Sequence, residues 1–571
     1  MRALFFCFLS VTMTTTIHTA TVDFGQRYIA AWTAFYPSKA LDQGIHAAIF
    51  DYEDLSPEKI ATWLDFNKEI LKVVSDLNAP AVQGRQIDAR LLRAQIRSEI
   101  HKWEQQKPHI NSPSLYIGLI SKAMEDILKA DFLDDADRAQ LICHRATAVK
   151  ALCISAIQSL KTGPQSELQR GLKQLAKTMT FYSETLPQLT RDWKMPAYCP
   201  DYTKIYQSTA GQIEELHKHL KTKIAPVATI SNPILGKQEY GRRLRNYFDN
   251  ELSPEALGQM ALEEIEEVRD LIYEVSKDYL LERYPDQAIP KNRLATIKAA
   301  FADMEEDAPT SGQDYLAFWQ DLSVKAMAFI EEHQIATLPK FQTLEIKSAP
   351  ESSGPAARIG WVESAPPFAP NPLTTLYLPS IPDTLPAQEQ KEFWSSFNKP
   401  FNRMIVIHEL FPGHYMQIKI SRESPHPVRL YFPYRLYFEG WATFTERVLL
   451  DAGWEKENKL TLLAHLRKRL ENANRAYTSV QVHCQNWNQE QVMQFSTETS
   501  LLAPQFAKSL WGRLMRSPMQ MTSYFLGGKL FTDLLASEKE RLGEDFVLID
   551  FMDTILRAGP IPIDEFTNLL K

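Results

Sequence analysis

The 571-residue chain is predicted to be mainly α-helical, with one small β-sheet. Apolar residues recur at three- and four-residue intervals over most of its length, as in LLRAQIRSEIHKWEQQ and ELQRGLKQLAKTMTFYSETL. Glycine is scarce at 21 residues, which disfavours turn-rich β architecture. The pattern changes only at about 341–380, where FQTLEIKSA, ARIGWVESA and LTTLYLPSI are short, alternating or β-branched segments separated by Pro, Gly and Ser. We expect these to form three strands of one sheet.

Length and charge limit the class of protein. A chain of 571 residues is too long for one compact core, so two or more lobes are expected. Its 44% hydrophobic and 23% charged composition is ordinary for a globular protein. The net charge of −7, with mixed signs along the chain, argues against a nucleic-acid partner, because such binders usually carry a basic face. Oligomeric state is left open.

The chain begins MRALFFCFLSVTMTTTIHTA, with an apolar run from Ala3 to Met13. This run is shorter than the about 20 residues that span a bilayer. We therefore predict a signal peptide over residues 1–20, cut near Ala20, and a periplasmic or secreted mature chain with no membrane span. Cys7 lies too early to be a lipid-attachment site. A buried N-terminal helix of a cytoplasmic protein is the alternative.

The mature chain keeps four cysteines, an even number that permits disulfides in an exported protein: Cys143, Cys153, Cys199 and Cys484. Cys143 and Cys153 stand about 15 Å apart along one predicted helix, too far to bridge each other. No CxxC pair or Cys/His cluster indicates a structural zinc.

The helical pattern predicts two lobes, an N-terminal one over 21–230 and a second over 231–571. The boundary is set by APVATISNPILG at 225–236, which interrupts the helical rhythm. A helix follows, with Ser253 as N-cap and Pro254 in its first turn. Its apolar stripe comprises Leu257, Ala261, Ile265, Val268 and Ile272. Its glutamates, expected on a solvated face, are Glu263, Glu264, Glu266 and Glu267.

The segment HELFPGH, His408 to His414, lies in a helical-looking stretch from about 393 to 421 and resembles a damaged HExxH zinc motif. In a regular helix, a residue six positions on points about 120° away, so two such histidines do not face one ion. Pro412 cannot donate to the carbonyl four residues back, and Gly413 tolerates unusual backbone angles. We expect a wide turn or π-type bulge that brings His414 beside His408. The alternative is that His408 and Glu409 form a buried, hydrogen-bonded polar pair that binds no metal.

A third ligand is expected from YFEGWATFTE. Glu439 lies 31 residues after His408, and two imidazoles plus a carboxylate, with one position left open, form a catalytic zinc arrangement. Thr443 and Glu446 share its helix face and can hold a ligand or support one. The alternative is a helix in which Gly440 and Trp441 only pack closely against a neighbour.

HELFPGHYMQ and FEGWATFTE resemble the pattern of the domain of unknown function 885 family, HEaxPGHxxQ followed by EGWAxYxE. Four other segments fall in the family's order: SPEALGQMALEEIEEV before these motifs, and VHCQNWNQEQV, SPMQMTSYFLGG and FMDTILRAGPIPIDEF after them. The likeness covers roughly 80–90% of the mature chain. The family resembles helical zinc peptidases of the angiotensin-converting-enzyme and carboxypeptidase Taq type. The resemblance implies a zincin-like fold over 231–571, with a deep cleft, a small sheet before the active-site helix, metal-site helices over 393–450, bound Zn²⁺ and short peptide substrates. By analogy, dipeptidyl peptidase III uses both histidines of an HExxH motif with an insertion.

Three positions depart from the family's pattern. Ser479 replaces an Asp, Met519 replaces the Gly of Pro-Gly-Gln, and Met552 replaces a His. None is a predicted ligand, so the departures bear on the substrate pocket or its supports.

These observations predict a zinc-dependent hydrolase, a metallopeptidase that cleaves short peptides. Glu409 is expected to be the general base. Tyr524 is the first candidate for a donor to the oxyanion and His483 the second, with packing as the alternative for both. The predicted zinc ligands are His408, His414 and Glu439.

Three further features bear on where a substrate could bind. Arg475 is expected on a solvated helix face, with a substrate carboxylate as the alternative partner. The strand 376–378 can pair with an extended peptide, and the aromatic run 431–434 either packs in the core or lines the pocket. The rival functions are a catalytically silent peptide-binding protein, which the intact Glu409 argues against, and a zinc hydrolase of non-peptide amides.

Overall fold

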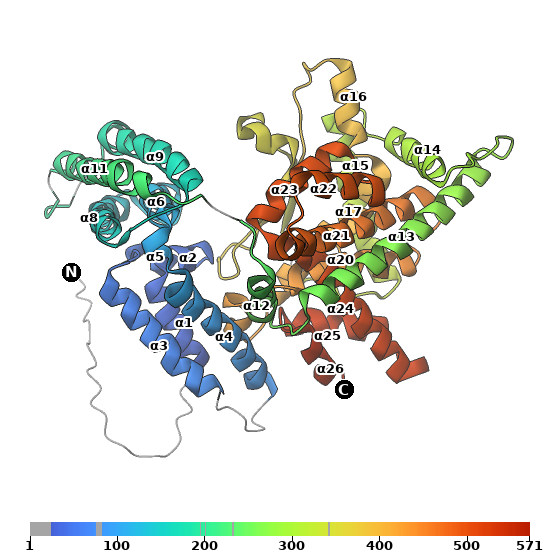
Figure 1. Ribbon diagram of the computed structural model, residues 1–571, viewed down its shortest axis with the longest axis horizontal. Helices are drawn as coiled ribbons and strands as arrows, with labels where there is room; N and C mark the ends of the chain where they lie inside the picture. Colours follow the sequence, from blue (N-terminus) through green and yellow to red (C-terminus); the bar gives the residue numbers. More distant parts are fainter. Residues whose placement is uncertain (1–23, 76–82, 195, 200, 231–232, 341–342) are drawn as a thin grey trace.

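The computed structural model describes residues 24–75, 83–194, 196–199, 201–230, 233–340 and 343–571. Helices make up most of this part of the chain, together with one three-stranded sheet, as predicted (Figure 1). The predicted signal peptide lies outside the described residues.

The first eleven α-helices lie together on one side of the molecule, coloured blue to green in Figure 1. Aspartates begin two of them, since the side chains of Asp134 and Asp201 accept from backbone N–H groups three residues on. The helices are α1 Phe24–Phe35, α2 Pro37–Asp42, α3 Pro57–Ser75, α4 Gln83–His101, α5 Pro108–Asn111, α6 Pro113–Lys122, α7 Glu125–Lys129, α8 Asp135–Ser159, α9 Gln165–Thr180, α10 Leu186–Leu189 and α11 Tyr202–His219.

The later helices form the other side, with α12 lying between the two groups in Figure 1. They are α12 Lys237–Phe248, α13 Pro254–Arg283, α14 Arg293–Glu306, α15 Gly312–Glu332, α16 Ala387–Ser395, α17 Lys399–Glu409, α18 His414–Ser421, α19 Pro427–Tyr431, α20 Tyr437–Asp451, α21 Lys459–Gln485, α22 Gln489–Gln494, α23 Pro504–Arg516, α24 Pro518–Leu542, α25 Leu548–Ala558 and α26 Phe566–Leu569. The division at 231 remains a prediction.

Helix α13 follows its sequence pattern closely. Ser253 accepts a hydrogen bond from the backbone of Ala256 at 3.1 Å, as an N-cap should. All five residues of the predicted apolar stripe are buried. Three of the four glutamates are exposed, and the half-buried Glu264 forms a salt bridge with Arg469 at 2.7 Å. The apolar stripe and the mostly solvated glutamate face are therefore both observed.

The predicted sheet is present, with β1 at Leu344–Ser348, β2 at Trp361–Ser364 and β3 at Thr374–Leu378. The order is β1-β3-β2, in which β3 pairs parallel to β1 and antiparallel to β2. Leu376 faces Ile346 on one side and Val362 on the other. Because β3 is the central strand, its backbone groups are already paired, and the expectation that 376–378 takes up a peptide strand is wrong.

The sheet is attached to the start of α18. The backbone N–H of Thr343, just before β1, donates to the Tyr415 hydroxyl at 3.0 Å. The Lys419 ammonium donates to the Thr343 hydroxyl at 2.7 Å. These bonds fix the sheet beside the helix that carries His414.

Aromatic stacking and ion pairs join the two groups of helices. Trp32 of α1 meets Tyr431 and Phe432 edge-on, with ring centroids 5.9 and 5.6 Å apart. Arg90 of α4 reaches carboxylates of the later helices and loops at 2.6–2.8 Å. These carboxylates belong to Asp249, Asp564 and Glu565. The aromatic run at 431–434 therefore packs between the two groups, with three of its four residues buried, and Tyr431 and Phe432 also line a cavity there.

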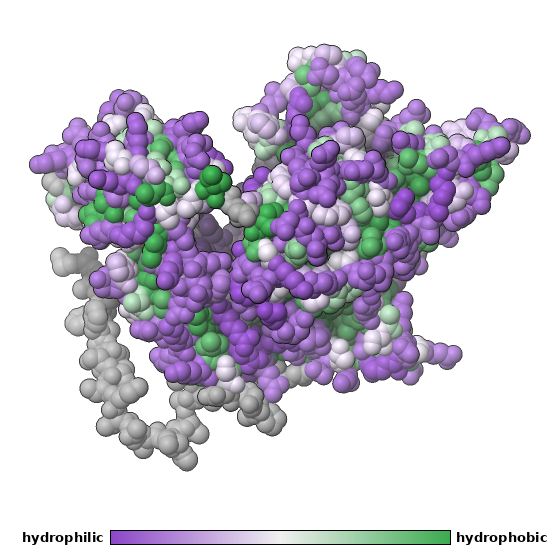
Figure 2. Space-filling view, viewed as in Figure 1, coloured by the Kyte–Doolittle hydropathy of each residue, from purple (hydrophilic) through white to green (hydrophobic). Residues whose placement is uncertain are grey.

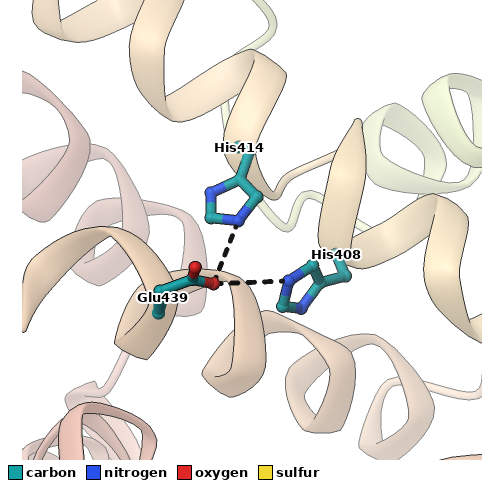
Figure 3. A group of neighbouring side chains, drawn as sticks. All are labelled: His408, His414 and Glu439. Carbon is teal, nitrogen blue, oxygen red and sulfur yellow. Dashed lines mark ion pairs between the residues drawn. The ribbon is translucent and has the colours of Figure 1, made fainter. Parts of the chain in front are cut away.

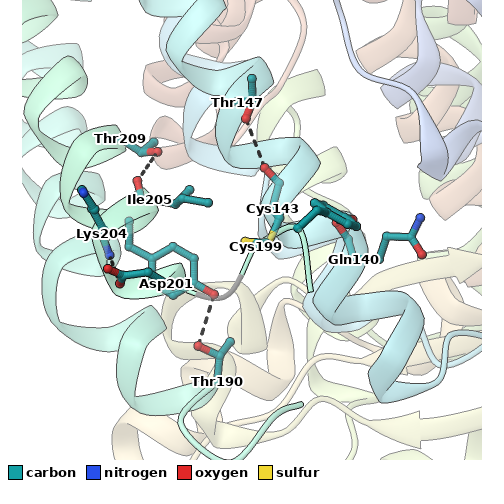
Figure 4. Close-up of a disulfide and its surroundings, with 11 residues drawn as sticks. Gln140, Cys143, Thr147, Thr190, Cys199, Asp201, Lys204, Ile205 and Thr209 are labelled. Atoms are coloured by element: carbon teal, nitrogen blue, oxygen red, sulfur yellow. Dashed lines mark hydrogen bonds between the residues drawn. A yellow bond between two sulfur atoms is a disulfide. The ribbon is translucent and has the colours of Figure 1, made fainter. Parts of the chain in front are cut away.

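A disulfide joins Cys143 of α8 to Cys199, 56 residues further along the chain (Figure 4). Cys153 is buried and unpaired, which agrees with the prediction that it does not bridge Cys143. The link ties the segment before α11 to α8.

The face shown in Figure 2 is largely hydrophilic, with scattered hydrophobic patches, and is notched between the upper parts of the two groups of helices. None of the helices in the described ranges combines the length and apolar character required to cross a bilayer.

Helices α20 and α24 approach each other at glycines. A Cβ added to Gly440 would stand 2.6 Å from the backbone of Gly527, and one on Gly527 would stand 2.7 Å from the Cα of Gly440. Side chains at either position would push the two helices apart. This contact sets the position of α20, which carries Glu439.

We expect Gly440→Ala to lower the free energy of unfolding by about 1–3 kcal/mol, because the added methyl overpacks the α20–α24 contact. Thermal and urea unfolding measure the change. The control is Gly211→Ala in α11, where a Cβ meets nothing within 4 Å and the better helix former adds about 0.5–1 kcal/mol. Equal behaviour of the two variants would contradict the close approach.

Candidate metal centre

The helix breaks within HELFPGH. Helix α17 ends at Glu409 and α18 begins at His414, so the helical-looking stretch from 393 to 421 is interrupted where Pro412 and Gly413 indicated a change. The last turn widens first, because the N–H of Phe411 donates to the Val406 carbonyl five residues back, at 3.2 Å. The Phe411–Pro412 peptide is cis. The expected widening is thus present, followed by a full break.

Gly413 is required at the break by a close approach of the chain. A Cβ there would overlap with the carbonyl oxygens of Ile407 and His408. No other residue fits this path without moving the end of α17. The Pro-Gly pair therefore turns the chain back on itself directly after the first histidine.

The second motif holds the break in place. The indole N–H of Trp441 donates to the Pro412 carbonyl at 2.9 Å, and the Trp441 side chain is fully buried. Without this donor the carbonyl, which α18 does not use, would be buried without a partner. Trp441 therefore does more than pack closely, because it fixes the loop between the two histidines.

Three side chains from α17, α18 and α20 converge at this point (Figure 3). Oε2 of Glu439 lies 3.4 Å from Nε2 of His414 and 3.8 Å from Nε2 of His408. The two imidazole rings are nearly perpendicular, with centroids 4.9 Å apart. Helix rotation alone would send the histidines apart, so the break is what brings them together.

A second set of side chains orients the imidazoles. Nδ1 of His408 lies 2.8 Å from Oε1 of Glu446, and the other oxygen of Glu446 lies 3.2 Å from Nδ1 of His465 on α21. Nδ1 of His414 faces the side-chain oxygen of Gln417 at 3.5 Å. With each Nδ1 turned toward an acceptor, each Nε2 is left for the centre.

Two of these partners were not identified from the sequence. His465 carries no local signal, because it comes from a separate helix. Gln417 stands one helical turn after His414, so the three-residue spacing was a usable signal. Glu446, by contrast, was predicted to support a ligand and is placed to do so.

The charges at the centre are coupled. Burial disfavours ionised Glu439, but the hydrogen bond and charge of His414 outweigh this and lower the pKa of Glu439 to about 2. Burial likewise disfavours charged His414, and Glu439 outweighs it to raise the pKa of His414 to about 9. Burial opposes ionisation of Glu446 too, yet its histidine partners lower its pKa to about 2. Both carboxylates are therefore anionic, the form that ligates or supports a cation.

The donor set fits zinc. Ligand bonds of about 2.0–2.2 Å in a tetrahedron place ligand atoms about 3.3–3.6 Å apart. The 3.4 Å between His414 and Glu439 falls in this range, and the 3.8 Å to His408 is slightly wider. Within the part of the chain that the structure describes, these three residues form the one His/Cys/Asp/Glu group whose ligand atoms lie within 4.8 Å of one another.

Two further predicted residues stand beside the centre. Glu409 is the last residue of α17, is partly exposed and acts electrostatically on His414. Tyr524 of α24 lies close enough to Glu439 to interact with it electrostatically, and burial followed by the charge of Glu439 raises the pKa of Tyr524. A tyrosine held protonated can donate a hydrogen bond next to the ligands.

Three sequence expectations need correction. Both ring nitrogens of His483 are occupied by backbone groups, those of Leu235 at 3.3 Å and Leu514 at 3.1 Å, so it is not free to donate to a substrate. Arg475 is not on a solvated face. It is buried, pairs with Glu471 and lies with its guanidinium 5.0 Å from the Tyr524 ring centroid. The buried Thr443 hydroxyl forms no hydrogen bond within the described residues, so it holds neither a ligand nor the partner of one.

Residues 37–570 match the family described as "Bacterial protein of unknown function (DUF885)". The chain belongs to this family. No curated protein matches it. Two solved structures share the fold. A candidate lipoprotein of unknown function from Shewanella oneidensis is 19% identical over 97% of this chain and 100% of that chain, with a TM-score of 0.84. A candidate lipoprotein from Colwellia psychrerythraea is 17% identical over 96% and 98%, with a TM-score of 0.72.

The positions at which this DUF885 member departs from the family pattern lie away from the three converging side chains. Ser479 is buried and accepts from the Tyr240 hydroxyl at 3.0 Å. Met552 is fully buried. Met519 lines a cavity that also contains Glu439. Of the three, Met519 is therefore the one that shares a cavity with a residue of the candidate centre.

We expect Glu446→Gln to weaken zinc binding by about 10–100-fold without unfolding the protein. One amide oxygen can replace one carboxylate oxygen, but the amide nitrogen cannot accept from the second histidine. Chelator competition measures the affinity. Glu538→Gln is the matched control, since Glu538 is equally buried but pairs with Arg541. Unchanged zinc affinity in the Glu446 variant would contradict the role of this carboxylate.

Proposed function

We propose that this DUF885 protein is a zinc-dependent hydrolase, specifically a metallopeptidase that acts on short peptides. The observation that carries the proposal is the convergence of His408, His414 and Glu439, whose ligand atoms lie within 4.8 Å of one another. Two imidazoles and one carboxylate leave a coordination position open, which is typical of catalytic rather than structural zinc sites. Glu409, the last residue of α17 before the break, supplies a carboxylate beside the ligands.

Zinc, when bound here, supplies Lewis acidity that polarises a carbonyl and makes water nucleophilic near neutral pH. Glu409 takes a proton from the attacking water and passes it to the leaving amine. Tyr524 donates its hydroxyl proton toward the oxygen on which negative charge develops. Glu446 holds His408 in the orientation that keeps Nε2 directed at the centre.

We also propose that the protein works outside the cytoplasm. The Cys143–Cys199 disulfide supports this, because such bonds persist in oxidising compartments. The two solved structures reported above are described as candidate lipoproteins, which is in keeping with such a location.

The test compares wild-type protein with Glu409→Gln. Elemental analysis of both purified proteins is expected to find about one zinc per chain, since the three ligands are unchanged. Digestion of a peptide library, read by mass spectrometry, is expected to fall by about 10²–10⁴-fold in the variant, which lacks the base. Glu423→Gln, an exposed glutamate just after α18, is the control and is expected to retain both zinc and activity.

Zinc absent from well-folded wild-type protein would overturn the proposal at its first step. Zinc present in both proteins with equal peptide cleavage would remove Glu409 as the base. Zinc bound without cleavage of any peptide would leave a silent binding protein or a hydrolase of other amides, and would refute the peptidase.

A further inference from the structure

A cavity of about 820 Å³ opens between the two groups of helices and reaches the metal centre, because Glu439 lies on its wall. One side comes from α1, α2 and α4 with the turn that follows it. The other comes from α12, from the segment 431–439 and from the start of α24, which contributes Met519 and also Ser523, the residue next to Tyr524. A ligand in this space lies next to the groups proposed to act on it.

The cavity wall is strongly cationic. Its two carboxylates both have partners, Glu439 at the metal centre and Glu99 as the acceptor from the Tyr36 hydroxyl at 2.6 Å and the Trp63 indole at 3.1 Å. Its six lysine and arginine side chains are Lys39, Lys102, Arg242, Arg243, Arg435 and Arg516. The protein as a whole carries a net charge of −7, so this local excess of positive charge is opposite to the overall balance.

Four of these cations have no salt-bridge partner among the described residues, although the charge of Glu99 acts on two of them, Lys39 and Lys102. Arg242 and Arg243 share Glu239, but within the described ranges none of the other four forms a salt bridge. Lys39 and Lys102 place their ammonium groups 3.7 and 4.9 Å from the Tyr36 ring centroid. Arg435 lies 3.9 Å from the Tyr247 ring centroid. The rings hold these cations against the wall without neutralising their charge.

Grouping like charges here has an electrostatic cost. Burial, and then the charge of Lys102, lower the pKa of Lys39 to about 8, with Arg435 adding to the effect. Burial also lowers the pKa of Lys102. An anion entering the cavity would favour the charged form of both lysines and relieve their mutual repulsion.

We propose that this cavity binds the acidic side chains of the substrate, so that the preferred substrates are peptides rich in aspartate and glutamate. This inference rests on the proposed function and adds a substrate class to it. Peptide carboxylates pair with the unpartnered cations, while the adjoining peptide bond is directed toward Glu439 and Tyr524. The positive wall also attracts such peptides over longer distances at low ionic strength.

The test measures binding without turnover, using the zinc-loaded Glu409→Gln protein. Fluorescently labelled short peptides are made in matched pairs, one with several glutamates and one with glutamine at the same positions. We expect the glutamate peptide to bind at least about tenfold more tightly at low salt, and the difference to shrink as salt is added. Fluorescence anisotropy gives both dissociation constants.

Substitution of the wall should remove the preference. Lys39→Gln combined with Arg435→Gln is expected to lose most of the tenfold difference while the glutamine peptide binds as before. Both side chains are accessible to solvent from the cavity, and neither forms a salt bridge among the described residues. The fold should therefore hold, and thermal unfolding checks this. The matched control is Lys298→Gln combined with Arg170→Gln, two exposed cations elsewhere, which should keep the preference.

Equal binding of the paired peptides, or a preference that survives in the Lys39/Arg435 variant, would overturn the inference. Its failure is separable from that of the proposed function. Cleavage of peptides by the wild type without an acidic preference refutes the cavity's role and leaves the peptidase standing. A charge-dependent preference in a protein that cleaves no peptide supports the cavity's role and refutes the peptidase.

Discussion

The candidate metal centre depends on one hydrogen bond between its two motifs, from the Trp441 indole to the Pro412 carbonyl. The break after α17 leaves this buried carbonyl without a backbone donor, and Pro412 has no N–H group of its own to donate. By binding it, α20 fixes both the path of the loop and its own position, since Glu439 lies two residues before Trp441. Helix α20 also packs against α24 at Gly440, where only a glycine allows so close an approach. The helix break, the Trp441–Pro412 hydrogen bond and the α20–α24 contact at Gly440 together fix the position of Glu439 relative to the two histidines.

The sequence predicted what local geometry decides. Helix rotation showed that His408 and His414 cannot face one ion in a regular helix, and Pro412 with Gly413 indicated where the helix must change. The sheet and the α13 stripe follow from periodicities that a short segment carries by itself. The change expected at Pro412 and Gly413 is a full break, which the apolar pattern alone does not show because it persists across the interruption.

Features set by partners distant in sequence were not predictable in the same way. Arg475 was expected in solvent, but Glu471 and the Tyr524 ring give it a buried environment that no local pattern encodes. His483 was a candidate donor to a substrate, but backbone groups from two separate segments hydrogen-bond both of its ring nitrogens. The central position of β3 likewise depends on strand order, which alternation within one strand cannot specify.

The basic cavity shows why the N-terminal helices belong to the site. Lys39 and Lys102 lie near the start of the chain, more than 300 residues from Glu439, and each alone is an ordinary charged residue. Contacts between the two groups, such as the packing of Trp32 against 431–432 and the ion pairs of Arg90, bring them to the wall on which Glu439 lies. The later helices carry the three converging side chains proposed as metal ligands, and the first helices contribute cations that form no salt bridge within the described residues. Under the proposed function, selectivity would arise at the contact between the two groups, where substitutions would alter the preferred substrate and leave the proposed ligands in place.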